Sequence, residues 1–124
     1  MQSIIIPSGV TSLGNYCFYN CYSLQSINIP SSATSLGNYC FNNCYSLQYV
    51  TMSDTVTSLG TNCFYGCYSL RIMYLKPTTP PTLSNTDAIP SNANLVIYVI
   101  SGSLTAYQSA SNWSTFASKI FEED

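Results

Sequence analysis

The sequence predicts an α/β solenoid, a chain wound into stacked coils that share one parallel sheet. The segment at residues 11–25 recurs at 34–48 and 57–71, which gives a period of 23 residues without gaps. The second half of each repeat has apolar residues at alternate positions, and the end of the chain departs from the period. A fixed period in the twenties with an atypical last unit is typical of a capped solenoid.

The second half of each repeat predicts a strand. In the first repeat it reads Leu24-x-x-Ile27-x-Ile29, and the next two repeats keep this spacing with other apolar residues. The alternating apolar side chains point into the coil, and their neighbours point outward. Strands of successive coils then pair in parallel, about 4.8 Å apart. We therefore expect strands at residues 3–6, 24–29, 47–52 and 70–75.

The first half of each repeat predicts a tight bend and a short helical turn. Gly14 permits a positive φ, and Ser12 or Asn15 can cap the turn. An apolar stripe at roughly helical spacing follows, made of Leu13, Cys17, Phe18 and Cys21. We expect this stripe to face the sheet across the coil.

Residues 1–75 are expected to form the repeat array, with a partial first coil and three repeats. Residues 3–8 align with residues 26–31, so the chain opens in the middle of a repeat. We therefore expect a leader or earlier coils to be absent from this chain. Residues 76–124 are expected to be a linker and a capping unit within the same domain, which cover the last coil's strand edge and core.

The capping unit has predicted elements of its own. Its Pro/Thr connector is expected to hold no regular structure, a β-branched segment to form a strand, and a short helix to follow a turn. These segments are residues 76–82, 95–100 and 104–109, with the turn and N-cap at 101–103. A second helical turn begins at Asn112, and Trp113 is expected in the core of the cap. The acidic end, Glu122, Glu123 and Asp124, is expected to be a solvated tail.

The repeats resemble the BspA-like leucine-rich repeats of bacterial surface proteins. The shared pattern is S-L-x-x-I-x-I-P-x-x-V-x-x-L-G-x-x-x-F-x-x-C over residues 3–75, and the segment from Ile97 to Trp113 is similar to the tail that follows such arrays. Cys17 and its equivalents depart from the family, which usually has Ala there. The resemblance implies a secreted or cell-surface protein engaged in adhesion or recognition, and it implies no catalytic residues.

Composition excludes several classes of function. Only 6% of residues are charged, the net charge is −2, and the basic residues are Arg71, Lys76 and Lys119. Three scattered cations cannot track a phosphate backbone, so nucleic-acid binding is not expected. No apolar run approaches the roughly 18 residues that span a bilayer. Without histidine there is no ordinary base for a Ser or Cys nucleophile, so no enzymatic activity and no cofactor are expected.

Six cysteines form one Cys-x-x-x-Cys pair in each repeat, at residues 17 and 21, 40 and 44, and 63 and 67. Three interpretations fit this spacing: columns of buried, reduced thiols, disulfides between neighbouring sulfurs, and a metal site. The first is favoured because the pairs flank the core Phe of each repeat. Parallel side chains in a ladder also aim their sulfurs alike.

The outward side of the predicted strands, which we call the sheet face, is the candidate binding site. Its side chains vary between repeats that are otherwise near copies, and the proposed contacts are Asn28, Tyr49, Thr51, Ile72 and Tyr74. Two hypotheses follow. The chain is an extracellular recognition module whose concave sheet face, with Tyr49 and Tyr74 central, binds a protein or glycan. Alternatively, it is a structural spacer within a longer cell-surface array.

The first predicted strand also suggests self-association. It contains Ile4, Ile5 and Ile6, carries no charge, and has no preceding coil in this sequence. An unpaired apolar edge strand presents free N–H and C=O groups that can pair with another chain. A second copy is therefore a candidate partner at this edge.

Overall fold

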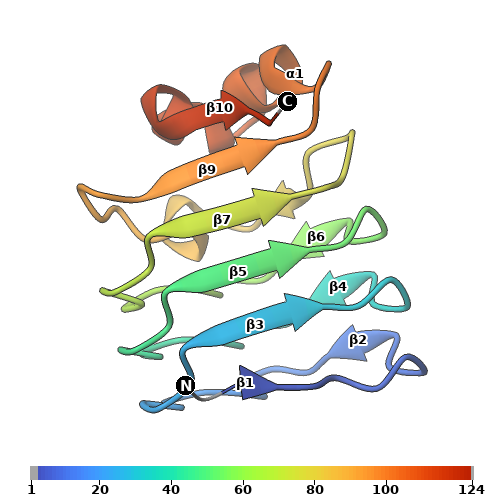
Figure 1. The fold of residues 1–124 in the computed structure, drawn as a ribbon, viewed down its shortest axis with the longest axis vertical. Coiled ribbons are helices and arrows are strands. Elements are labelled where there is room, and N and C mark those ends of the chain that lie inside the picture. The colour runs from blue at the N-terminus through green and yellow to red at the C-terminus, as the bar shows by residue number, and fades with distance from the viewer. Residues whose placement is uncertain (1–2, 124) are drawn as a thin grey trace.

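The chain is a stack of coils held by two parallel sheets, as the computed structural model of residues 3–123 shows (Figure 1). The larger sheet has the order β1-β3-β5-β7-β9-β10, with bounds Ser3–Ile4, Ser26–Ile29, Tyr49–Met52, Ile72–Leu75, Val96–Val99 and Ile120–Glu122. The smaller sheet has the order β2-β4-β6-β8, with bounds Ser12–Leu13, Ser35–Leu36, Ser58–Leu59 and Thr82–Leu83. The predicted solenoid and its parallel strands are confirmed.

The constant repeat length sets the register of the larger sheet. Ser26 pairs with Tyr49 and Tyr49 with Ile72, so each step covers one period. Between β7 and β9 the step is one residue longer, because Ile72 pairs with Val96. The strands of the repeats begin two residues later than predicted. Leu24 and its equivalents lie between the turn and the strand, although their side chains are buried.

The predicted helical turn is wrong, because a second sheet and a series of turns take its place. Strand β2 pairs with β4 across the coils, and the backbone then turns with positive φ at Tyr16 (61°) and Asn20 (60°). The N–H groups of Tyr16 and Phe18 donate to carbonyls of the next coil, at 2.9 and 2.8 Å. These donors are therefore used between coils and not within a helix.

Two local predictions about this turn are also wrong. Gly14 does not adopt a positive φ, and the left-handed positions fall on Tyr16 and Asn20 instead. Asn15 does not cap its own turn. Its Oδ1 accepts a hydrogen bond from the backbone N–H of Asn38 in the next coil, at 2.8 Å. The polar side chain therefore joins two coils.

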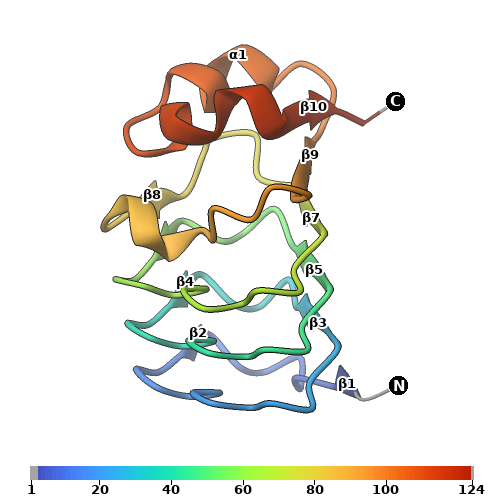
Figure 2. The same cartoon turned by 90° about the vertical axis from the view of Figure 1, so that its left-hand side faces the viewer.

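The two sheets lie on different sides of the coils (Figure 2). The core consists of columns of equivalent side chains from successive coils. Phe18, Phe41 and Phe64 stack with ring centroids 5.1 and 5.0 Å apart. Phe41 and Phe64 are fully buried, whereas Phe18 in the first coil is only partly buried. The predicted apolar stripe does face the sheet, although the backbone that carries it is not helical.

The C-terminal unit packs on the last repeat through one short α-helix and two 3-10 turns. These are α1 (Leu104–Ser109), η1 (Thr86–Ala88) and η2 (Trp113–Lys119), so the predicted helix at residues 104–109 is confirmed. Trp113 is buried, as expected, and its Nε1 donates to the carbonyl of Pro81 at 2.7 Å. Tyr107 donates to the carbonyl of Pro77 at 2.7 Å, and burial raises its pKa. Thr82 of the predicted connector belongs to β8, which is regular structure.

The acidic end is not a free tail as far as the structure describes it. Ile120–Glu122 forms β10, which pairs in parallel with β9, and the Glu123 N–H donates to the carbonyl of Val99 at 2.7 Å. The Glu122 carboxylate accepts hydrogen bonds from the N–H groups of Gly102 and Leu104, at 2.9 and 3.4 Å. Carboxylates favour helix N-termini, so Glu122 caps the start of α1 where Ser103 makes no side-chain cap. Asp124 lies outside the described residues.

Candidate binding face

The sheet face is built from the outward side chains of β3, β5, β7, β9 and β10, because alternate residues of a strand point to opposite sides. The inward residues are buried, while the outward ones are half-buried or exposed. The register aligns them in two columns. One is Asn28, Thr51, Tyr74, Tyr98 and Phe121, and the other is Ser26, Tyr49, Ile72 and Val96.

All five proposed contact residues lie on this face. Asn28 is exposed, and Tyr49, Thr51, Ile72 and Tyr74 are half-buried. Asn28 and Thr51 are neighbours in one column, as are Tyr49 and Ile72 in the other. The structure therefore brings the five together from three adjacent strands.

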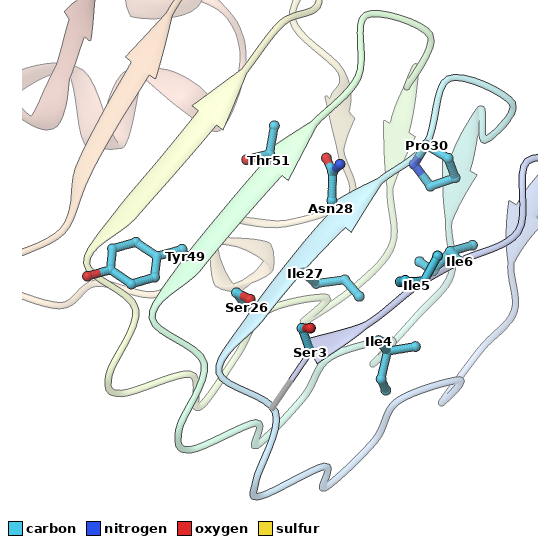
Figure 3. Close-up of a pocket in the computed structure, with 10 residues that line it drawn as sticks. All are labelled: Ser3, Ile4, Ile5, Ile6, Ser26, Ile27, Asn28, Pro30, Tyr49 and Thr51. Carbon is cyan, nitrogen blue, oxygen red and sulfur yellow. The ribbon is translucent and has the colours of Figure 1, made fainter. Parts of the chain in front are cut away.

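A shallow hollow of about 420 Å³ occupies the N-terminal end of the sheet face (Figure 3). Asn28 and Thr51 project into it side by side from β3 and β5, and Ser26 and Tyr49 also line it. The remaining wall comes from Ile27, Pro30 and residues 3–6, of which Ile5 is 91% exposed. This end of the face is uncharged and combines amide, hydroxyl and aliphatic groups.

A second hollow, of about 300 Å³, lies at the other end of the face. Tyr74 and Tyr98 line it with their rings stacked, 5.6 Å between centroids and 17° between planes. Ile72, Glu122 and Glu123 complete the lining. This end of the face therefore presents aromatic surface beside two carboxylates.

Sequence reasoning missed the part of the face that the C-terminal unit supplies. Tyr98 extends the Asn28 column, and Phe121, 49% exposed, follows it on β10. A signal was present, because Ile120 lies one 23-residue period after its partner Ile97. The strand was missed because the acidic residues at the end of the chain are typical of a solvated tail.

A comparison of the sequence with known protein families agrees with the stacked coils and the core described above. A model of the BspA-type leucine-rich repeat region matches residues 1–123 in six copies. The chain belongs to the BspA-type leucine-rich repeat family. Six copies also equal the number of strands that the larger sheet has within residues 3–123. No curated protein matches the sequence significantly.

Membership of the BspA-type family agrees with a surface that serves for interaction. Repeats of this family are typically non-enzymatic protein-interaction modules and are usually found at the cell surface. None of the helices within residues 3–123 is long and apolar enough to cross a bilayer. The same range contains no group of three or more His, Cys, Asp or Glu residues arranged to hold a metal.

The six cysteines of the BspA-type array are free thiols, and all except Cys17 belong to the core or pack against it. Four are buried as predicted, but Cys17 is exposed and Cys21 half-buried, because no described coil covers the first one. The thiols of Cys44 and Cys67 donate to carbonyls of the preceding coil, at 3.2 and 3.1 Å. Burial raises the pKa of Cys63, and a hydrogen bond with Cys44 together with burial raises that of Cys67. Cys63 and Cys67 therefore stay protonated and unreactive.

Proposed function

We propose that the chain is a non-enzymatic recognition or adhesion module at the cell surface, which binds a protein partner through the sheet face. The observation that carries this proposal is where the repeats differ. Residues 11–25 and 34–48 are identical except at Tyr19 and Asn42, yet Asn28, Thr51 and Tyr74 differ in one column of the face. Inward strand positions change only among apolar residues, as in Ile27, Val50 and Met73, whereas these outward positions change in polarity and size. Such change on an exposed face is expected where a partner makes contact.

The composition of the sheet face supports a protein partner. Tyr49, Tyr74, Tyr98 and Phe121 supply large contact area, and aromatic residues are enriched at the centres of protein interfaces. A tyrosine has few torsions to order on binding. At the N-terminal end of the face, the amide of Asn28 and the hydroxyl of Thr51 can form directional hydrogen bonds with a partner.

An extracellular location is part of this proposal. The chain carries few charges and derives its polar surface from hydroxyl and amide groups, which suits an extracellular binding surface. The usual cell-surface location of the family points the same way.

We further propose that residues 76–124 serve as linker and cap for the array of residues 1–75 within one domain. The hydrogen bonds of Tyr107 and Trp113 to Pro77 and Pro81 support this division, since they tie the connector to the cap. The Asn112 amide also donates to the carbonyl of Leu83, at 2.8 Å. A chain ending near residue 75 should expose Leu75 and unfold more readily than the whole chain.

The test of the sheet face uses variants that the repeats themselves provide. Tyr49→Ser, Thr51→Asn and Tyr74→Thr each introduce the residue that the preceding coil carries in the same column, so the fold should tolerate them. The purified chain is screened against arrays of extracellular proteins and glycans, and the Kd of each hit is measured with the triple variant. We expect a loss of at least about tenfold, as for interface anchors.

Tyr19→Asn is the matched control, since it copies Asn42 on an exposed position away from the sheet face. It should leave the Kd unchanged. Hits that the triple variant binds as well as the parent would overturn the binding role of the face. A screen without any hit would favour the spacer role.

A further inference from the structure

A column of exposed tyrosines runs along the turns that precede the strands of the larger sheet. Tyr22, Tyr45 and Tyr68, which we call the tyrosine ladder, stack with centroids 5.0 and 5.7 Å apart and planes within 2° and 7°. In a stack of this kind both faces of the middle ring are covered, and only the end rings keep a free face. Tyr68 ends the ladder toward the cap and is 68% exposed, the highest value among these three rings.

The structure explains why the ladder stops at Tyr68. The next segment along the stack contributes Asn92 and not a fourth aromatic residue. Its Nδ2 donates to the carbonyls of Cys67 and Leu70, at 2.8 and 3.1 Å, which ties the amide to the backbone on both sides of Tyr68. The outer face of the Tyr68 ring therefore borders open space.

That space is a hollow of about 500 Å³. Most of its lining residues lie just before β7 and β9, and Figure 1 shows the starts of these strands on the left. Its volume falls in the roughly 300–1,000 Å³ range of small-ligand sites. The residues that line it are Gln48, Tyr68, Ser69, Arg71, Asn92, Ala93 and Asn94. No residue of the sheet face is among them, so this is a separate surface.

The hollow also collects positive charge in a chain whose net charge is −2. Arg71 is exposed and lines it, although the equivalent positions in the other repeats hold Gln25 and Gln48. The Lys119 ammonium donates to the carbonyls of Asn92 and Ala93 on its wall, at 2.7 and 3.4 Å. Among residues 3–123, none of the acidic residues lines the hollow.

We propose that this hollow binds a sugar that carries a carboxylate, such as a uronic or sialic acid residue. The apolar face of a pyranose ring packs on the free face of Tyr68, and the planar guanidinium of Arg71 pairs with the carboxylate through two parallel hydrogen bonds. The amide and hydroxyl groups of Gln48, Ser69 and Asn94 match the sugar hydroxyls. An apolar peptide anchor has no enclosing aliphatic wall here, since Ala93 is the only aliphatic residue of the lining.

The test is an NMR titration of the full chain with five probes: the methyl glycosides of glucuronic acid, N-acetylneuraminic acid and glucose, sodium acetate, and an acetylated Asp-Gly dipeptide. We expect at least one acidic sugar to shift the amide signals of residues 68–71 with a Kd of about 1 mM, the scale of a single sugar. The two acidic sugars distinguish the two sources of the carboxylate. Methyl glucoside, acetate and the dipeptide should each bind at least about tenfold more weakly.

Variants separate the contribution of the Tyr68 ring from that of the Arg71 charge. Arg71→Gln copies the other repeats and should weaken the acidic sugar at least about tenfold while leaving any neutral-sugar shift unchanged. Tyr68→Ala should abolish binding, and Tyr68→Phe should retain it because the ring face remains. Tyr22→Ala, at the other end of the ladder, and Lys76→Gln are the controls and should change nothing.

Three outcomes would overturn the proposal. Equal affinity for acetate and the acidic sugars would reduce the site to a simple anion contact. Equal affinity for the dipeptide and the acidic sugars would show that the hollow binds acidic peptides. No shift at residues 68–71 with either acidic sugar would remove the site altogether.

Discussion

The Oδ1 atom of Asn15 accepts a hydrogen bond from the backbone N–H of Asn38, 2.8 Å away in the next coil. Asn38 makes the same bond to the N–H of Thr61, again at 2.8 Å. This contact requires close approach of the coils beside Gly37 and Gly60. A Cβ on Gly60 would lie 2.5 Å from both the backbone nitrogen and the Oδ1 of Asn38. Gly37 and Gly60 therefore serve coil contact and not a left-handed turn.

Gly60→Ala should destabilise the chain by about 1–3 kcal/mol, the usual cost of forcing extra volume into packed structure. Gly14→Ala is the matched control, because a Cβ on Gly14 meets nothing within 4 Å. It should change the free energy of unfolding by less than about 0.5 kcal/mol. Urea unfolding followed by circular dichroism measures both. Equal effects of the two substitutions would contradict the role of the glycines in coil contact.

The cysteines should react with a thiol reagent in a fixed order. Cys17 is exposed and Cys21 half-buried, whereas the other four are buried. We expect Cys17 to be labelled first, Cys21 second, and the remaining four only on unfolding. Mass spectrometry after timed labelling gives the order, and Cys17→Ala should remove the fastest phase. Labelling of Cys63 in the native chain at the rate of Cys17 would show that the coils do not pack as described.

Stability should fall at alkaline pH because of the buried Cys63 thiol. Burial raises the pKa of Cys63 well above 9.0 in the folded chain. Below pH about 9 the folded and unfolded chains both keep this proton, so the full stability is present; above it only the unfolded chain loses the proton. The free energy of unfolding then falls by about 1.4 kcal/mol per pH unit until the folded pKa of Cys63 is reached.

Urea midpoints between pH 8 and 10 measure this effect, before most tyrosines of the unfolded chain ionise. Cys63→Ala is less stable at every pH, but its free energy should fall less steeply, by about 1.4 kcal/mol per pH unit. A parent chain whose stability stays level across this range would rule out protonated, buried thiols.

The exposed first strand should support self-association. Ile4 and Ile5 are 40% and 91% exposed, and β1 has a pairing partner on only one side in the described sheet. Ile5→Lys should weaken association because charge on an edge strand opposes pairing. Sedimentation velocity over a concentration series measures it, with Tyr19→Asn as an exposed aromatic control. A parent chain that stays monomeric at the highest concentration would contradict the prediction.

Most of the fold could be predicted from the 23-residue period. It specified which residues pair, because Ile27, Val50 and Met73 recur at one spacing and align in the sheet. The second sheet could not be predicted in this way. Its strands are two residues long, and the donors of the following turn bond to the next coil, which a local pattern does not reveal.

The sheet face was predictable in its repeated part only. Asn28, Thr51 and Tyr74 follow from alternation along the predicted strands. Tyr98 and Phe121 enter the same column after a one-residue shift of the period at β9. The hollow beside Tyr68 depends on the end of a stack and on Asn92, both of which are visible only in three dimensions.

Hydroxyl-radical footprinting of the chain with and without a bound protein partner tests the role of the sheet face most directly. Tyrosines on the face and in the ladder react alike with the radical, so each group controls the other. We predict that the partner protects Tyr49, Tyr74 and Tyr98 and leaves Tyr22 and Tyr45 as reactive as in the free chain. Protection of the ladder with an unchanged sheet face would contradict the proposed function.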